Sequence, residues 1–370
     1  MRILTVFGTR PEAIKLALLA HRLNARSDVR HALCVTGQHR QMLDQVLDVF
    51  SLKPDYDLAL MRENQSLSSL SALALTRVSE TIAAYKPDWV VVQGDTTSAF
   101  IAALAAFYLK IRVAHVEAGL RTGNIYSPWP EEANRKLISQ IASVHFPPTE
   151  TSADNLRREG VCADDILTTG NTVIDALHWV RARLEKDKTL RATLDAQFAF
   201  LPNNKRLILV TGHRRENMDG GLARTCAALA QLAAREDVAI VYPVHLNPQV
   251  QATAYKILGA HPDIHLIAPL DYVPFVYLMC RAHLIITDSG GIQEEAPGLG
   301  KPVLVTRDTT ERPEALAAGT ARLVGTDGAQ LFHAATQLLN DERAYAAMAH
   351  AANPFGDGQA SLRIAQRLLQ

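Results

Sequence analysis

Three acidic side chains in the first half of the chain stand where apolar runs end or where a helix is expected to begin. Asp95 comes just after the apolar run 89–92, and Glu117 comes directly after the run 113–116. Glu131 begins a segment that reads Glu-Glu-Ala-Asn-Arg. Carboxylates grouped in this way are typical of proton transfer or of metal binding. No His or Cys ligand pattern accompanies them, so the sequence favours proton transfer.

A basic helix start follows the first apolar run. Residues 8–12 read Gly-Thr-Arg-Pro-Glu, in which Thr9 and Glu12 have the spacing of a capping box and the proline suits a first helical turn. A helix N-terminus attracts anions, and Arg10 and Lys15 add positive charge that suits a phosphate. A well-capped helix with two solvated cations is the alternative interpretation.

The second half of the chain repeats this arrangement. Residues 211–217 read Thr-Gly-His-Arg-Arg-Glu-Asn after another apolar run, and His213 could bind a phosphate or transfer a proton. Residues 288–296 read Asp-Ser-Gly-Gly-Ile-Gln-Glu-Glu-Ala, and their small residues would let backbone amides approach a pyrophosphate. Glu295 could accept from ribose hydroxyls, and Arg312 is a further anion ligand candidate. An ordinary glycine-containing strand-to-helix turn is the alternative.

The elements that must position these side chains alternate along the chain. Short β-branched runs are separated by longer segments with apolar residues three and four apart, which predicts parallel sheets covered by helices. The expected fold class is α/β, with two doubly wound Rossmann-like domains whose strand ends face each other across a cleft. The predicted strands are residues 3–7, 89–92, 113–116, 207–211, 239–242, 284–287 and 303–305, and predicted helices are 12–23, 97–109, 222–234 and 329–339.

Chain length predicts two domains, because 370 residues exceed the size at which a single core keeps growing. The N-terminal domain is expected to span 1–171 and the second domain to span 172–353. A helix of mixed charge, 175–187, follows the boundary. The last segment, 354–370, ends in a predicted helix, 360–369, which is expected to pack back on the first domain.

The composition argues against several classes of protein. Lys plus Arg and Asp plus Glu balance at 38 each, which argues against general binding of nucleic acid or of an anionic membrane. The four cysteines are scattered without a Cys-x-x-Cys pair, which fits a reducing cytoplasm and no disulfide framework. No apolar run approaches the length of a membrane span or signal peptide, so a soluble cytoplasmic protein is expected.

Common cofactor motifs are missing from the sequence. There is no Gly-x-Gly-x-x-Gly after a strand, and residues 298–302 fail as a phosphate-binding P-loop because Glu295 and Pro302 occupy required positions. His261 and His265 have a metal-ligand spacing, but the intervening proline favours a surface loop. We therefore expect no NAD, ATP or zinc, and no cofactor of another kind.

Taken together and in order, these motifs resemble the non-hydrolysing UDP-N-acetylglucosamine 2-epimerases, nearly from end to end. The resemblance implies a GT-B-like fold, as in two-domain nucleotide-sugar glycosyltransferases, a homodimer, and interconversion of UDP-GlcNAc with UDP-ManNAc. The product would supply ManNAc-type precursors for cell-surface polysaccharide. The matching segments are residues 8–12, 94–97, 115–121, 130–135, 212–216 and 288–295.

The resemblance also implies roles for individual residues. Leu270 stands where family members often have a polar side chain, so its contact with the base is expected through the backbone. Asn64 stands at the position of a family arginine in a second, regulatory UDP-GlcNAc site. The implied catalytic residues are Asp95, Glu117, Glu131 and His213; the implied substrate contacts are Arg10, Lys15, Asp95, Glu117, His213, Leu270, Phe275, Ser289, Gly290, Gly291, Glu295 and Arg312; the implied regulatory residues are Gln38, Gln41, Glu131 and His245.

Epimerisation at C2 must remove a hydrogen that no carbonyl group acidifies. Elimination of UDP from C1 would give 2-acetamidoglucal, and re-addition of UDP with protonation from the other face would give the epimer. Arg10, His213 and Arg312 could stabilise the departing diphosphate. The proton steps would fall to the three acids, and which acid serves which face stays open. Each acid alone could instead be a helix cap or an ion-pair partner, as the i,i+4 spacing of Glu131 and Arg135 illustrates.

Three other functions share parts of this pattern. A glycosyltransferase of the same fold would share the UDP site, but the Glu-x7-Glu pattern of retaining members is absent, because Thr287 lies eight positions before Glu295. A hydrolysing epimerase would release free ManNAc and UDP. A non-catalytic nucleotide-sugar sensor would leave the acids unexplained.

Overall fold

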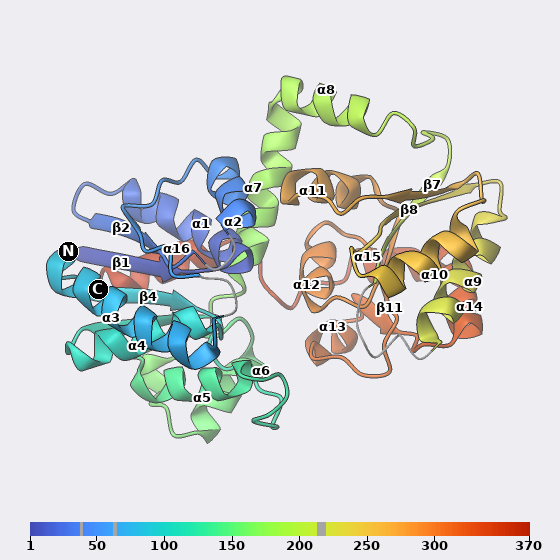
Figure 1. Ribbon diagram of the computed structural model, residues 1–370. Coiled ribbons are helices and arrows are strands. Elements are labelled where there is room, and N and C mark those ends of the chain that lie inside the picture. Colours follow the sequence, from blue (N-terminus) through green and yellow to red (C-terminus); the bar gives the residue numbers. More distant parts are fainter. Residues whose placement is uncertain (38–39, 62–64, 213–219) are drawn as a thin grey trace. The chain divides into compact units, whose positions relative to one another are not determined.

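Each half of the computed structural model is built on its own six-stranded parallel sheet (Figure 1). The structure describes residues 1–37, 40–61, 65–212 and 220–370, and of residues 40–42 it describes the backbone alone. Unit 1 contains Met1–Ala176 and Phe355–Gln370, and unit 2 contains Leu177–Pro354.

The sheet of unit 1 has the strand order β3-β2-β1-β4-β5-β6. The chain leaves β1 toward one edge and later returns to β4 on the other side of β1, so the topological switch point lies between β1 and β4. The strands are β1 (Arg2–Phe7), β2 (Arg30–Val35), β3 (Tyr56–Asp57), β4 (Trp89–Gln93), β5 (Arg112–Val116) and β6 (Val144–Phe146). The helices are α1 (Arg10–Asn24), α2 (Arg40–Val49), α3 (Leu67–Tyr85), α4 (Thr97–Tyr108), α5 (Glu131–Ile141) and α6 (Glu150–Arg158), with a 3-10 turn at Ala163–Asp165.

The sheet of unit 2 repeats this topology in the order β12-β11-β10-β7-β8-β9, with its switch point between β7 and β10. Its strands are β7 (Arg206–Thr211), β8 (Val238–Pro243), β9 (Ile264–Ile267), β10 (Leu284–Thr287), β11 (Val303–Val305) and β12 (Ala321–Leu323). Its helices are α8 (Lys188–Gln197), α9 (Gly221–Ala233), α10 (Pro248–Leu258), α11 (Tyr272–Arg281), α12 (Gly290–Gly298), α13 (Pro313–Ala317), α14 (Gly328–Asn340) and α15 (Glu342–Ala349).

The fold class and the central strands predicted from sequence are confirmed. Residues 284–287 form β10 and residues 303–305 form β11, both as expected, and the expected helix 329–339 is α14. Central strands are recognisable because both faces are covered, which makes them continuous apolar runs. The strands β2, β3, β6, β9 and β12 were not predicted. A histidine interrupts the apolar residues of β2, which reads Arg-His-Ala-Leu-Cys-Val, and of β9, which reads Ile-His-Leu-Ile. The segments Val-His-Phe of β6 and Ala-Arg-Leu of β12 are too brief to show a pattern.

Helix α7 (Thr172–Lys186) holds the C-terminal helix α16 (Ala360–Leu368) in place on unit 1. Helix α7 begins in unit 1 and ends in unit 2, and α16 belongs to unit 1, where it packs against α1. Asp175 of α7 accepts hydrogen bonds from the backbone N–H of Ala360 at 3.1 Å and of Ser361 at 2.8 Å. It therefore caps the N-terminus of α16 from a position far away in sequence.

Among the helices that the structure describes, none combines the length and the apolar character that crossing a bilayer requires.

The cap at α16 yields a stability prediction. Asp175 is 5% exposed, and burial raises the pKa of its carboxyl group despite the N–H donors around it. We expect Asp175→Ala to lower the free energy of unfolding by about 1–3 kcal/mol, because two buried N–H groups lose their acceptor. Asp175→Asn keeps one acceptor oxygen and removes a buried charge, so its loss should be smaller. Urea unfolding measures both, and equal stability of the alanine variant and the unchanged protein would contradict the role of this cap.

Two buried histidines yield a pH prediction. The rings of His115 on β5 and His145 on β6 lie 6.4 Å apart, and burial lowers their pKa values to about 3 and about 4. As the pH falls below about 6.5, the ordinary pKa of histidine, the unfolded chain binds protons at these two positions, whereas both rings stay neutral in the folded protein. The contribution of these histidines to the free energy of unfolding is therefore fully present above about pH 6.5. It decreases as the pH falls, by about 2 kcal/mol per histidine at about pH 5.

Replacement of one ring tests this pH dependence. His145→Phe should reduce the drop in unfolding free energy between about pH 7 and about pH 5, because one proton-binding group disappears from the unfolded state. Thermal or urea unfolding across that range measures the slope. A slope identical to that of the unchanged protein would show that His145 does not titrate on unfolding.

Candidate active site

Glu117 lies at the carboxyl edge of the unit 1 sheet, directly after β5, and is only 6% exposed. Its two carboxylate oxygens accept from Lys15 Nζ at 2.7 and 2.6 Å. Gln93 Nε2 at the end of β4 donates to the same carboxylate, and Asn171 Nδ2 donates at 3.1 Å. Three elements distant in sequence thus converge on one acidic side chain.

The backbone around Glu117 has an unusual conformation. Glu117 itself has a φ of 60°, in the left-handed region that side chains other than glycine rarely adopt. Gly119, two residues later, has a φ of 87°, and a Cβ atom there would lie 2.1 Å from the carbonyl oxygen of Ser152. A non-glycine residue held at positive φ is more common at functional sites, where the surroundings offset its cost of about 1–3 kcal/mol.

Asp95 follows β4 and has a different set of partners. Arg135 of α5 donates to its Oδ2 from Nε at 2.8 Å and from a terminal nitrogen at 2.7 Å. Asn134 of the same helix donates to the backbone carbonyl of Asp95 at 2.8 Å. Arg135 also pairs at 3.0 Å with Glu132, whose side chain is fully buried. Helix α5 is thereby attached to the end of β4.

Glu131 is the first residue of α5 and is half-buried. Within the part of the chain that the structure describes, its side chain makes no hydrogen bond or ion pair. The pair with Arg135 that the i,i+4 spacing would allow is replaced by the pairs of Arg135 with Asp95 and Glu132. The three expected acids therefore differ in their contacts: Glu117 and Asp95 each pair with a cation, whereas Glu131 pairs with none among the described residues.

The start of α1 lies at the switch point beside these loops. Thr9 and Glu12 form the predicted capping box, and the buried Glu12 also accepts from Thr96 Oγ1 at 2.6 Å. Burial raises the pKa of Glu12 even though four hydrogen-bond donors surround it. Arg10, the first residue of the helix, is half-buried and has no hydrogen bond or ion pair to the described residues, so its guanidinium can bind an anion.

The carboxyl edge of the unit 2 sheet carries the second group of expected residues. The hydroxyls of Thr211 on β7 and Thr287 on β10 are 2.6 Å apart across the switch point, and Ser289 N donates to Thr287 Oγ1 at 2.9 Å. Helix α12 begins at Gly290, where a Cβ atom would lie 3.8 Å from the guanidinium carbon of Arg312. This guanidinium, which is paired with Glu294, lies beside the helix N-terminus, where an anion is favoured.

Glu295 of α12 is 7% exposed and accepts a hydrogen bond of 3.0 Å from the Tyr272 hydroxyl. Tyr272 begins α11, which also carries Phe275, and Leu270 lies just before that helix; both of these side chains are half-buried. The residues expected to bind UDP in unit 2 are therefore placed on α11, on α12 and at the start of α13.

Several expected residues cannot be compared with the structure. His213, Gln38 and Asn64 lie outside the described residues, and the side chain of Gln41 is likewise not described. His245 is exposed on the loop after β8, where its Nδ1 accepts from the backbone N–H of Asn247 at 3.1 Å. The catalytic role of His213 and the regulatory site stay predictions.

The structure adds residues that motif reasoning did not single out. Asn171, at the expected domain boundary, is 2% exposed and donates to Glu117. Gln93 likewise donates to Glu117, and the buried Glu132 pairs with Arg135, the partner of Asp95. The only sequence signal for them is that polar residues interrupt or end apolar runs. Among the described residues no group of His, Cys, Asp and Glu side chains is arranged to hold a metal ion.

Comparison with known proteins places this geometry in a family. The family model described as UDP-N-acetylglucosamine 2-epimerase matches residues 21–369. The UDP-N-acetylglucosamine 2-epimerase of Yersinia pestis is 56% identical over 369 residues, covering 100% of this chain and 98% of the relative. The probable UDP-N-acetylglucosamine 2-epimerase of Ralstonia nicotianae is 56% identical over 368 residues, covering 99% of this chain and 98% of the relative.

Solved structures agree with the sequence relatives. The crystal structure of UDP-GlcNAc 2-epimerase from Neisseria meningitidis bound to UDP-GlcNAc has a TM-score of 0.92 and 49% identity, and the match covers 100% of both chains. The Methanocaldococcus jannaschii UDP-GlcNAc 2-epimerase in complex with UDP-GlcNAc and UDP has a TM-score of 0.81 and 34% identity, covering 100% of this chain and 99% of the other. The protein belongs to the UDP-N-acetylglucosamine 2-epimerase family.

Proposed function

We propose that this protein interconverts UDP-GlcNAc and UDP-ManNAc by epimerisation at C2. The observation that carries the proposal is the group of carboxylates at the switch point of unit 1, in a chain that belongs to the UDP-N-acetylglucosamine 2-epimerase family. The nucleotide sugars bound by the Neisseria meningitidis and Methanocaldococcus jannaschii proteins support the choice of substrate.

The proposed reaction is an elimination followed by an addition. A base takes the proton from C2 while the bond between C1 and the UDP oxygen breaks, so that the C2–H electrons form the C1–C2 double bond of 2-acetamidoglucal. UDP leaves with the electrons of the broken C–O bond. In the return step UDP oxygen adds to C1 and an acid delivers a proton to the opposite face of C2.

Unit 2 is proposed to bind the UDP. Gly290 and Gly291 at the start of α12 leave backbone N–H groups open to a diphosphate, and Ser289 and Arg312 lie beside them. Glu295 is proposed to accept from the ribose, with Phe275 and the backbone at Leu270 next to the base. Arg10 and Lys15 supply further positive charge from unit 1, and His213 from the loop after β7. These groups would stabilise the negative charge that grows on the leaving diphosphate.

The contacts of the three acids suggest different proton roles. The Lys15 ammonium group donates to both carboxylate oxygens of Glu117, whereas Glu131 has no cation partner among the described residues. We therefore propose that Glu131 exchanges a proton at C2 in the resting arrangement. Glu117 would take part in proton transfer when an anionic diphosphate attracts Lys15. Asp95 would also take part in proton transfer. Its pair with Arg135 fixes the end of β4 relative to α5.

The proposal extends to the cellular setting predicted from the resemblance: a cytoplasmic homodimer that supplies ManNAc-type precursors for polysaccharide, with UDP-GlcNAc bound also at a regulatory site. Phe107, Tyr108 and Leu109 are exposed at the end of α4, which supports an interface between two copies. Sedimentation of the purified protein would measure the oligomeric state directly.

Deuterium exchange tests the reaction itself. In deuterated water containing UDP-GlcNAc, we expect UDP-ManNAc to appear and C2 of both recovered UDP-sugars to become deuterated, because every turnover exchanges the C2 proton with solvent. NMR measures position and extent of labelling. Recovery of unlabelled UDP-GlcNAc without UDP-ManNAc would refute the epimerase, whereas free ManNAc with UDP would indicate the hydrolysing reaction instead.

Amide variants test the acids. Asp95→Asn, Glu117→Gln and Glu131→Gln should each lower kcat by about 10²–10⁴-fold, the usual contribution of a positioned proton-transfer group. UDP binding, followed by calorimetry, should be retained because the proposed UDP contacts lie mainly in unit 2.

The matched control for these variants is Glu150→Gln, which removes an exposed carboxylate from the first turn of α6 and should leave kcat unchanged. Glu131 is the most informative of the three positions, because its side chain has no ion pair with the described residues to lose. Full activity of Glu131→Gln would remove this residue from the proton transfer.

A further inference from the structure

A cavity in unit 2 gathers positive charge outside the groups discussed so far. Its volume is about 330 Å³, and α7, α8, α11 and the segment after α12 line it. Four cationic side chains line it, against a single lining carboxylate, that of Glu185. The four cations are Arg181, Arg191, Arg281 and Lys301.

The partners of these cations leave much of the charge uncompensated. Arg181 pairs with Glu185 at 3.0 Å, and Arg191 pairs with Asp195 at 3.1 Å. The guanidinium of Arg281 donates instead to neutral oxygens, those of the Tyr277 hydroxyl at 3.3 Å and the Asn203 amide at 3.0 Å. Lys301 is half-buried and its ammonium group has no hydrogen bond or ion pair to the residues that the structure describes.

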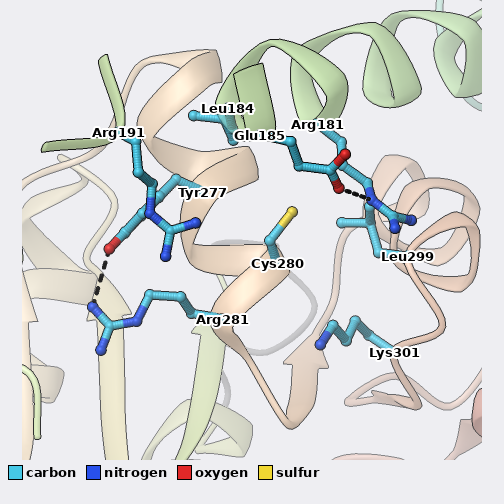
Figure 2. A pocket seen from close by; sticks show the side chains of 9 residues that line it. All are labelled: Arg181, Leu184, Glu185, Arg191, Tyr277, Cys280, Arg281, Leu299 and Lys301. Carbon is cyan, nitrogen blue, oxygen red and sulfur yellow. Dashed lines mark hydrogen bonds and ion pairs between the residues drawn. The ribbon is translucent and has the colours of Figure 1, made fainter. Parts of the chain in front are cut away.

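Tyr277 holds two of the cations in fixed positions. The guanidinium carbons of Arg191 and Arg281 lie 5.2 and 5.7 Å from the centre of its ring, within the range of cation–π attraction. The ring itself is fixed because it stacks on Phe198 with centroids 5.5 Å apart. Figure 2 shows Arg191, Tyr277 and Arg281 on one side of Cys280 and Arg181 on the other, with Lys301 below. The cations therefore surround one space.

Bringing like charges together around a cavity is unfavourable unless an anion enters it. Burial, and to a lesser extent the charge of Arg181, lower the pKa of Lys301. Guanidinium groups match phosphate oxygens in geometry, and a lysine adds a point charge. The volume would hold about ten water molecules at about 30 Å³ each, which is room for two phosphoryl groups.

We propose that this cavity is a binding site for a compact anion bearing two phosphoryl charges, separate from the proposed UDP site. Lys301 and Arg281 are its principal ligands, and Arg181 and Arg191 close its rim. The proposal does not depend on the epimerase reaction. The cavity is nevertheless linked to the proposed UDP site through one helix, because α11 carries Phe275 near its start and Arg281 at its end.

Protection of the Cys280 thiol provides a local measurement of occupancy. Cys280 lines the cavity and is partly accessible, whereas Cys34 and Cys226 are buried. The alkylation rate of Cys280 by neutral iodoacetamide is followed by mass spectrometry of its peptide, with inorganic pyrophosphate as the probe. Sodium chloride at equal ionic strength controls for screening. Each variant is compared with its own rate without pyrophosphate, because the substitutions also change the reactivity of the thiol.

Pyrophosphate should slow alkylation of Cys280 in the unchanged protein, and Lys301→Met and Arg281→Gln should each raise the half-protecting concentration about tenfold or more. Lys256→Met removes an exposed cation of α10 and should leave protection unchanged. Arg312→Met weakens the proposed UDP site and should also leave it unchanged. Melting temperatures verify that each variant is folded.

Three outcomes would overturn the proposal. The first is the absence of protection by millimolar pyrophosphate beyond that of sodium chloride. The second is protection that survives Lys301→Met and Arg281→Gln. The third is protection that disappears in Arg312→Met, because the anion would then act from the UDP site. Loss of epimerase activity in Arg312→Met with intact Cys280 protection would separate the two sites.

Discussion

The constraint on which the structure depends is that a parallel sheet sends every strand-to-helix loop to the same edge. In unit 1 this brings together the loops after β1, β4 and β5, which are separated by about a hundred residues of sequence between Arg10 and Glu117. The order of strands places β1 next to β4, so the start of α1 lies beside Asp95 and its neighbours. In unit 2 the ends of β7 and β10 are brought together in the same way, and the hydroxyls of Thr211 and Thr287 form a hydrogen bond there.

Polar side chains beneath this edge hold the loops in position. Glu12 connects the start of α1 to the start of α4 through Thr96, and the buried Glu132 accepts from Thr122 N at 3.1 Å while it holds Arg135. Burying carboxylates costs free energy, and it is tolerated because each one is satisfied by several donors. Glu117, at positive φ, is satisfied in the same way by Lys15, Gln93 and Asn171.

Sequence patterns predicted those elements of the fold that depend on residues close together in the sequence. The run Trp-Val-Val-Val identified β4, and the spacing of Thr9 and Glu12 identified the capping box of α1. The motifs also led to the acids Asp95, Glu117 and Glu131. The pairing of those acids was not predictable, because the contacts of Lys15 with Glu117 and of Arg135 with Asp95 join positions about 40 to 100 residues apart. Only the folded chain determines such neighbours.

The discontinuity of unit 1 has a consequence for how the protein is made. The last helix of this unit, α16, is synthesised after all of unit 2, and it supplies the surface that packs against α1. A ribosome therefore releases every residue of unit 2 before the first unit has its complete core. Until then the apolar surface of α1 that α16 covers stays exposed, so during translation the N-terminal half is vulnerable to aggregation at this surface.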